Sequence, residues 1–117
     1  PGVLMIESMA QTCGSLLMAR NGCERLPYLA EVRVAKLRNF VLPGALLIVT
    51  GVVEHEGSGY AIAHGKVEHE AKVIAEAELR YRQMPFPSEA LRNAMVQRAV
   101  KIGLMQRSES GEVRIGN

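Results

Sequence analysis

Tryptophan is absent from this sequence, and the aromatic residues together make up only 4% of it. A core must therefore be built mainly from valine, isoleucine, leucine, methionine and alanine. The chain has only two cysteines, Cys13 and Cys23, and their spacing resembles neither a zinc site nor the framework of a secreted disulfide protein. We expect both to be reduced thiols in a cytoplasmic protein that uses no metal and no cofactor.

The sequence also has little excess of charge of either sign. The net charge of +2 is too small to indicate a nucleic-acid-binding protein. Cationic residues late in the chain leave two alternatives open, a solvated surface or a basic patch for an acidic protein or a phosphate-bearing ligand. These residues are Arg80, Arg82, Arg92, Arg98, Lys101 and Arg107.

No stretch predicts a membrane span. Residues 1–20 are the most apolar, but they are barely long enough to cross, and Glu7, Gln11 and two serines interrupt them. They also lack the basic beginning of a signal peptide. With 117 residues, 48% of them hydrophobic, the chain fits one globular domain.

The apolar stretch predicts a buried helix from Gly2 to about Arg20, ended by Gly22. Glu7 is its only carboxylate, and burying an ionised carboxylate without partners is costly, so this acid should pair or do chemistry. Gln11 lies four residues further on the same helical face, and its amide can donate to that carboxylate. The free N–H groups near Gly2 would point at whatever lies beyond the helix start.

Four later segments alternate with the period of a strand, over residues 28–37, 45–55, 60–70 and 72–82. Residues 56–59, EGSG, have the composition of a hairpin loop, and a short turn is expected at Glu70 and Ala71. The last strand has one polar face and one apolar face, the latter formed by Val73, Ala75, Ala77, Leu79 and Tyr81.

Ser88 is a candidate N-cap for a second, amphipathic helix over about residues 88–105. Residues 106–117 are polar, contain glycine and lack periodicity, so we expect a mobile tail there. The sequence therefore predicts an α+β protein with a single domain over residues 1–105. Its long central helix is wrapped by an antiparallel sheet, and the amphipathic helix follows.

The segment PGVLMIESMAQ, residues 1–11, closely resembles the PGVLxxEAxAQ motif of the FabZ-type 3-hydroxyacyl-[acyl-carrier-protein] dehydratases. LRNFVLPGALL and HGKVEHEAKVIAEAELRYR resemble two further segments of that family, so the resemblance covers about residues 1–82. It departs at Glu70 and Ala71, where the family often has Asp-Gly. The resemblance implies a hotdog fold and a hydro-lyase of fatty-acid-type biosynthesis, which eliminates water from 3-hydroxyacyl thioesters.

Carried over to this sequence, the resemblance makes Glu7 the acidic catalytic residue. It assigns substrate binding to Gly2, whose N–H polarises the thioester carbonyl, and to Gln11, which supports the acid. The implied partners are acyl carrier protein or an acyl-pantetheine thioester, and further copies of the chain in a dimer or a trimer of dimers.

In that family a catalytic histidine lies in an HFPGxP motif, which would fall before Pro1. We therefore expect weak or absent dehydration from this sequence. We keep two alternatives, a non-catalytic binding module for acyl thioesters or carrier proteins, and a hotdog thioesterase in which Glu7 activates water. His55, His64 and His69 are expected to be structural or surface groups. His69 is the first to examine, because a histidine on an apolar strand face needs a polar partner.

Overall fold

The computed structural model describes residues 2–38, 41, 44–101 and 112–115. Its elements are, in chain order, α1 (Gly2–Arg20), β1 (Arg25–Leu37), β2 (Leu47–Gly57), β3 (Tyr60–His69), β4 (Lys72–Pro85), α2 (Glu89–Lys101) and β5 (Glu112–Ile115). The predicted order of one long helix, an antiparallel meander and a second helix is confirmed.

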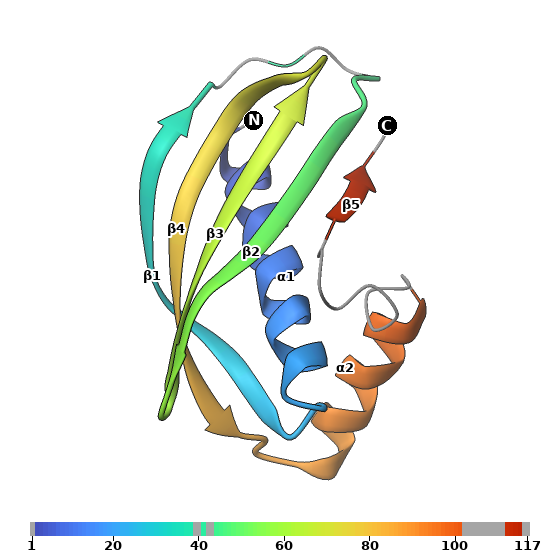
Figure 1. Ribbon diagram of the computed structural model, residues 1–117. Coiled ribbons are helices and arrows are strands. Elements are labelled where there is room, and N and C mark those ends of the chain that lie inside the picture. Colours follow the sequence, from blue (N-terminus) through green and yellow to red (C-terminus); the bar gives the residue numbers. More distant parts are fainter. Residues whose placement is uncertain (1, 39–40, 42–43, 102–111, 116–117) are drawn as a thin grey trace.

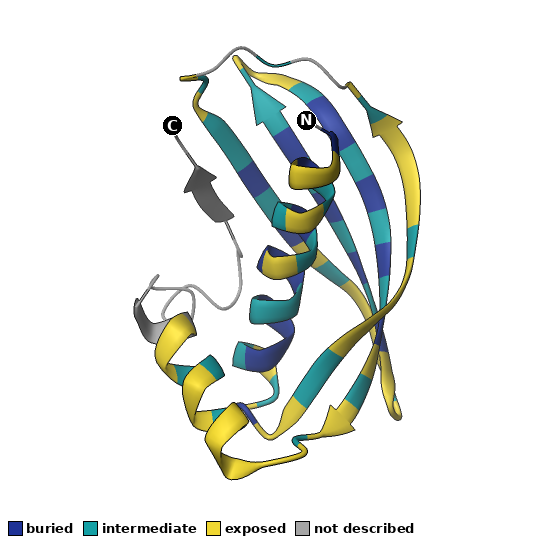
Figure 2. Ribbon diagram, turned by 180° about the vertical axis from the view of Figure 1, so that it is seen from behind, coloured by how far each residue is buried: buried dark blue, intermediate teal, exposed yellow. Residues whose placement is uncertain are grey.

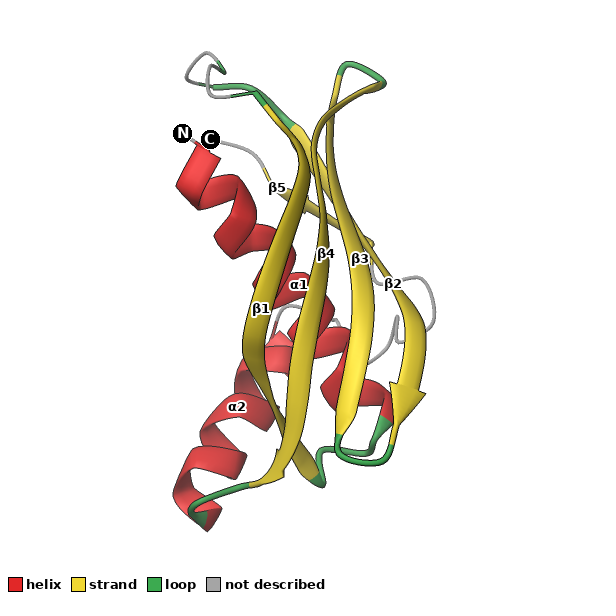
Figure 3. Ribbon diagram, turned by 90° about the vertical axis from the view of Figure 1, so that its left-hand side faces the viewer, coloured by secondary structure: helices red, strands yellow, loops and turns green. Residues whose placement is uncertain are grey.

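The strands form one antiparallel sheet in the order β1-β4-β3-β2-β5. Helix α1 lies along one face of this sheet, and α2 lies beyond the end of β4 (Figures 1 and 3). The sheet is strongly twisted, so its strands curve past α1 without enclosing it. The fold is thus α+β, as predicted.

Strand β4 shows how the sequence divides the two faces. Ala75, Ala77, Leu79 and Tyr81 are buried against α1, and the glutamates and arginines between them lie on the outer face, as the alternation predicted. The same alternation predicts that Ile74, between Val73 and Ala75, lies on the polar face, and this is wrong, because Ile74 is buried. The pairing with β3 shifts register beside it, which breaks the strict alternation on which the prediction depended.

Ion pairs connect the strands across the outer face. The Arg80 guanidinium donates to Glu78 at 2.8 Å, and Glu31 lies 4.0 Å from the same nitrogen. The hydrogen bond from Arg80 lowers the pKa of the Glu78 carboxyl below its ordinary value. Arg80 is therefore already paired within its own sheet, although such exposed pairs contribute little to stability.

Two glycines in the sheet let α1 come close. Gly51 on β2 and Gly65 on β3 are direct cross-strand partners. A Cβ atom added to Gly65 would lie 3.0 Å from the Cβ of Met9, and one added to Gly51 would lie 2.9 Å from the Sγ of Cys13. Met9 and Cys13 are one helical turn apart, so this glycine pair forms the surface on which the middle of α1 rests.

Helix α1 is long and apolar enough to cross a membrane by length and composition alone, with a mean hydropathy of 1.2 over its best window. The core helix of a soluble protein meets the same criteria. Here the side chains of Met5, Met9, Cys13 and Leu17 are at most 4% exposed, because they pack on the sheet. This packing identifies α1 as the core helix.

The C-terminus of α1 and the N-terminus of α2 both lie where the sequence predicted them. Gly22 takes a φ of 69°, and the N–H of Cys23 donates to the carbonyl of Met18 at 2.9 Å, which closes the C-terminus of α1. The hydroxyl of Ser88 accepts a hydrogen bond from the N–H of Leu91 at 3.1 Å, which confirms the predicted N-cap of α2.

The predicted tail contains a strand. β5 pairs with the first residues of β2, Leu47–Thr50, although the sequence showed no period there. Residues 102–111 and 116–117 lie outside the described residues, as do Pro1, Pro43 and Arg107 among the positions singled out from the sequence. The mobility of residues 106–117 therefore stays a prediction.

Strand β1, at one edge of the sheet, contains two bulges. Its register with β4 shifts between Leu29 and Glu31 and again between Val34 and Lys36, so Ala30 and Ala35 are extra residues without a partner. Bulges bend a strand and increase its twist. The bending of β1 around the helix side of the sheet follows from them (Figure 1).

The turn between β3 and β4 is conformationally strained. Glu70 and Ala71 both have positive φ, 51° and 66°, between the paired residues His69 and Lys72. Such turns favour Asn-Gly or Asp-Gly, because a left-handed residue with a Cβ costs about 1–2 kcal/mol. Ala71→Gly is therefore expected to stabilise the protein by about 1 kcal/mol, after the greater freedom of glycine in the unfolded chain is subtracted. Urea unfolding measures this gain.

The matched control is Ala90→Gly in the first turn of α2, an exposed alanine in an ordinary helical conformation. There the same exchange should destabilise the protein, by up to about 1 kcal/mol. If both exchanges lowered the urea midpoint alike, the strain at Ala71 would be refuted.

Candidate active site

The sequence singled out Glu7, and the structure places it on the side of α1 that faces away from the sheet. Val3, Glu7 and Gln11 are spaced by four residues and are all exposed, so they form one stripe along the helix (Figure 2). The prediction that Glu7 is buried was wrong. The sheet covers only one side of α1. Apolar residues on every side of the helix therefore did not mean that every side is buried.

Apolar side chains border the acid. Val3 is 74% exposed and Leu4 is 56% exposed, one turn before Glu7. Exposed apolar side chains in a large contiguous patch are typical of places where a ligand or another protein binds. The carboxylate therefore lies within an open, mainly apolar part of the helix.

Gly2 is the first residue of α1 and is buried. The first turn of the helix has no acidic side chain, so no carboxylate of that turn can accept from its free N–H groups. These groups remain the positive end of the helix dipole. The structure thus brings Glu7 and Gln11 together on one face and places the buried Gly2 at the start of the helix.

Two of the three histidines face away from this stripe. His64 precedes Gly65, which faces α1, so its ring lies on the outer face of the sheet, where Nε2 is 3.3 Å from a carboxylate oxygen of Glu76. His55 lies near the C-terminal end of β2, and its Nε2 is 2.8 Å from the hydroxyl of Tyr60. Both have polar partners of their own, in keeping with the structural or surface roles predicted for them.

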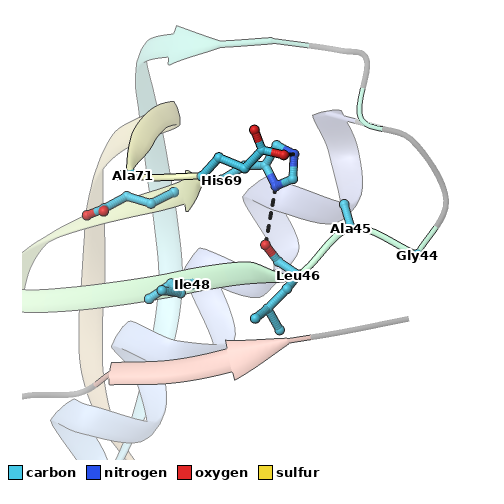
Figure 4. Close-up of a pocket in the computed structure, with 8 residues that line it drawn as sticks. Gly44, Ala45, Leu46, Ile48, His69 and Ala71 are labelled. Atoms are coloured by element: carbon cyan, nitrogen blue, oxygen red, sulfur yellow. Dashed lines mark hydrogen bonds and ion pairs between the residues drawn. The ribbon is translucent and has the colours of Figure 1, made fainter.

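His69 has the polar partner that the sequence required. Its Nδ1 is 3.3 Å from the carbonyl oxygen of Leu46, and its Nε2 is 3.5 Å from a carboxylate oxygen of Glu70 (Figure 4). The contact with a carbonyl oxygen requires a proton on Nδ1. Between these partners the ring is held at the turn that joins β3 and β4.

This ring borders a shallow pocket of about 450 Å³ that the sequence did not reveal, because no motif marks it. Neither Glu7 nor Gln11 lines it, so the pocket is separate from the stripe on α1. Within the described ranges, no three His, Cys, Asp or Glu side chains lie close enough to hold a metal ion. The pocket is lined by Gly44, Ala45, Leu46, Ile48, Glu68, His69, Glu70 and Ala71.

Burial on the sheet side of α1 makes stability depend on pH. It raises the pKa of the Cys13 thiol from its ordinary value of 9.0 to about 12, and it also raises the pKa of Tyr81. The unfolded chain therefore loses the Cys13 proton above pH 9 while the folded protein keeps it. Stability should be complete below pH 9 and fall between about pH 9 and 12, by up to about 1.4 kcal/mol per pH unit.

Urea unfolding at pH 8 and pH 10 measures this loss. Cys13→Ala is expected to remove most of the difference between the two conditions, because the thiol no longer titrates. If the variant lost as much stability between pH 8 and pH 10 as the original protein, Cys13 would not be the group responsible.

Comparison with known proteins gives a family match. The model of the FabA-like domain matches residues 1–78, which include the whole of α1 and the strands as far as the middle of β4. The match therefore covers the exposed stripe and the glycine pair beneath the helix.

Curated relatives match between 68% and 74% of the chain. The protein named 3-hydroxyacyl-[acyl-carrier-protein] dehydratase FabZ in Fusobacterium nucleatum is 38% identical over 81 residues, which are 69% of this chain and 57% of that protein. The proteins of that name in Wolinella succinogenes and Aliivibrio fischeri are 39% and 33% identical over 88 and 89 residues, or 68% and 74% of this chain and 58% and 59% of those proteins. The chain thus spans less than three fifths of the length of these relatives.

Proposed function

The chain belongs to the FabA-like domain family and has its hotdog fold, and on that premise we propose that it eliminates water from 3-hydroxyacyl thioesters. The similarity to proteins named 3-hydroxyacyl-[acyl-carrier-protein] dehydratase supports this reaction class. In the proposal, the substrate is carried by acyl carrier protein or by pantetheine, and the protein acts in the cytoplasm.

One observation carries the proposal. Glu7 and Gln11 lie one turn apart on the open face of a helix whose other face is packed into the core. A carboxylate on the face packed against the sheet would be closed to substrate, whereas a ligand can reach the exposed Glu7. The exposed side chains of Val3 and Leu4 would lie against an acyl chain or a neighbouring subunit.

In the proposed mechanism the Glu7 carboxyl protonates the leaving 3-hydroxyl group, which departs as water. A base removes the proton from C2, and its electron pair forms the double bond between C2 and C3. The N–H groups at the start of α1, beginning at Gly2, stabilise the negative charge that develops on the thioester oxygen. Gln11 donates to the Glu7 carboxyl and holds it in place.

The base is proposed to come from outside this sequence. The three histidines have partners elsewhere in the fold, and His64 lies on the opposite face of the sheet from α1. The resemblance supplies a histidine from a segment that would precede Pro1, and it pairs that residue with the acid of another subunit. We therefore propose a homo-oligomer, a dimer or a trimer of dimers, in which the stripe on α1 faces a second copy.

The test is hydration of a crotonyl thioester, the reverse reaction, followed by the loss of enoyl absorbance. The chain should turn over slowly, and added imidazole should raise its rate by acting as the base that removes the C2 proton. Turnover that neither imidazole nor Glu7→Gln changes would overturn the proposal. Release of free thiol without hydration would indicate a thioesterase that uses Glu7 to activate water.

The positions of the histidines favour one second candidate, a non-catalytic module that binds an acyl thioester or a carrier protein. Such a module keeps the apolar surface around Glu7 without a base beside it. An acyl-pantetheine should then raise the melting temperature, by an amount that grows with its concentration, while no product forms even with imidazole present. Product formation would exclude this candidate.

A further inference from the structure

Among the residues that the structure describes, Tyr81 is the only aromatic side chain of the buried core. Its ring projects from the inner face of β4 toward the middle of α1, and the residue is 3% exposed. The phenol donates a hydrogen bond to the carbonyl oxygen of Ala10 at 2.6 Å.

In an α-helix the N–H of Gly14 donates a hydrogen bond to the carbonyl of Ala10, four residues earlier. The phenol thus bonds to the carbonyl end of this hydrogen bond from outside the helix. A carbonyl oxygen has two lone pairs, so that of Ala10 can accept from the phenol as well as from within the helix. Tyr81 therefore fastens α1 to β4 at this turn.

The sequence of α1 is weakest at this point. Residues 12–15 read Thr-Cys-Gly-Ser, four consecutive residues with low helix propensity. The Tyr81 ring lies against this stretch, since a Cβ at Gly14 would lie 3.7 Å from the ring atom Cε2. Tyr81 therefore contacts α1 where the helix would bend most easily.

The two halves of α1 are held unequally. The second half buries three consecutive large side chains, Leu16, Leu17 and Met18, each at most 2% exposed. The first half buries Met5 and Met9 and leaves its remaining large side chains partly or fully exposed. Movement at residues 12–15 would thus shift the first half of the helix, the part that carries the stripe.

We infer that Tyr81 is a positioning residue, which ties α1 to β4 at Ala10 and so fixes the direction in which the helix presents Glu7. The inference rests on the proposed function for the role of Glu7. Tyr81 itself touches none of the reacting atoms, because its ring lies on the buried side of α1.

Amide hydrogen exchange in Tyr81→Phe tests the inference without any assay of activity. Phenylalanine keeps the ring and removes the hydrogen bond to Ala10. Exchange in α1 up to Gly14 should accelerate about fivefold, the factor that corresponds to one hydrogen bond of ordinary net strength, relative to the amides of β3 and β4. Equal acceleration in helix and sheet, or no change in the helix, would overturn the inference.

Gly14→Ala supplies the matched rescue. The added methyl group would meet Tyr81 at ordinary contact distance, and alanine is the strongest helix former. In the Tyr81→Phe background it should slow exchange in the first half of α1 back toward the original rate. If exchange stayed fast, the weak helical turn would not be what Tyr81 compensates.

Catalysis provides the second readout. Tyr81→Phe is expected to lower kcat for crotonyl thioester hydration about tenfold and to leave KM within about twofold, since a misdirected acid slows chemistry more than binding. An unchanged kcat together with loosened α1 would show that the tie does not direct Glu7. If the original protein has no turnover under any condition, the proposed function fails, and the exchange pattern alone still decides whether Tyr81 holds the helix.

Discussion

Replacing Glu7 with glutamine is expected to lower the rate of crotonyl thioester hydration by about 10²- to 10⁴-fold, the range typical of a lost general acid or base. Glutamine has nearly the same shape as glutamate but cannot exchange a proton at neutral pH. Because Glu7 is exposed on α1, the exchange should change stability by no more than about 0.5 kcal/mol. A large loss of rate in a normally folded protein would therefore report on chemistry.

Glu54→Gln is the matched control, because Glu54 is an exposed glutamate on β2 and undergoes the same change in charge. Its rate should stay within twofold of the original. The measurement is made with and without imidazole, and imidazole should raise the rate of Glu54→Gln but not that of Glu7→Gln. Equal rates for the two variants would remove Glu7 from the mechanism.

The glycines under α1 carry the largest expected effect on stability. Gly65→Ala should cost about 1–3 kcal/mol, because the new methyl group would lie 3.0 Å from the Cβ of Met9 and 3.2 Å from a methyl group of Leu79. Neither neighbour can move far, since both Met9 and Leu79 are fully buried. Urea unfolding measures the loss, and Gly14→Ala, which has no contact closer than 3.7 Å, serves as the control.

Gly51 allows the same contact to be tested by rescue. A Cβ on Gly51 would lie 2.9 Å from the Sγ of Cys13, but its next neighbours are 3.5 Å away or further. Cys13→Ala removes that sulfur, so Gly51→Ala should cost about 1–2 kcal/mol less in the Cys13→Ala background than alone. If Gly51→Ala cost the same stability in both backgrounds, the sulfur of Cys13 would not be what limits the space at Gly51.

The ends of the elements could be predicted because their signals are local. Gly22 at the end of α1, Ser88 before α2 and the turn at Glu70 and Ala71 each act within a few residues of the chain. Their geometry in the structure follows from backbone conformations and hydrogen bonds that a short stretch of sequence determines. The inner face of β4 from Ala75 onward was predictable for the same reason, since alternation is local.

The exposure of Glu7 could not be predicted from its neighbours. Apolar residues are common on protein surfaces as well as in cores, so the run that includes Val3 and Leu4 did not reveal which side of the helix the sheet would cover. The bond between Tyr81 and Ala10 was equally out of reach, because 71 residues separate its partners. Long-range register decides both features, and the sequence contains no local trace of it.

The two bulges of β1 limit how the length of this strand can change. The inward residues of this strand are Leu29, Val32, Val34 and Leu37, opposite the buried side chains of β4, and their spacing of three, two and three residues requires the extra alanines. Substitutions at Ala30 or Ala35 should be accepted readily, since both are exposed and unpaired. Deletion of either would turn one end of β1 over, placing charged side chains against α1. Related sequences can thus vary in residue type at these two positions, but not in the number of residues between Leu29 and Leu37.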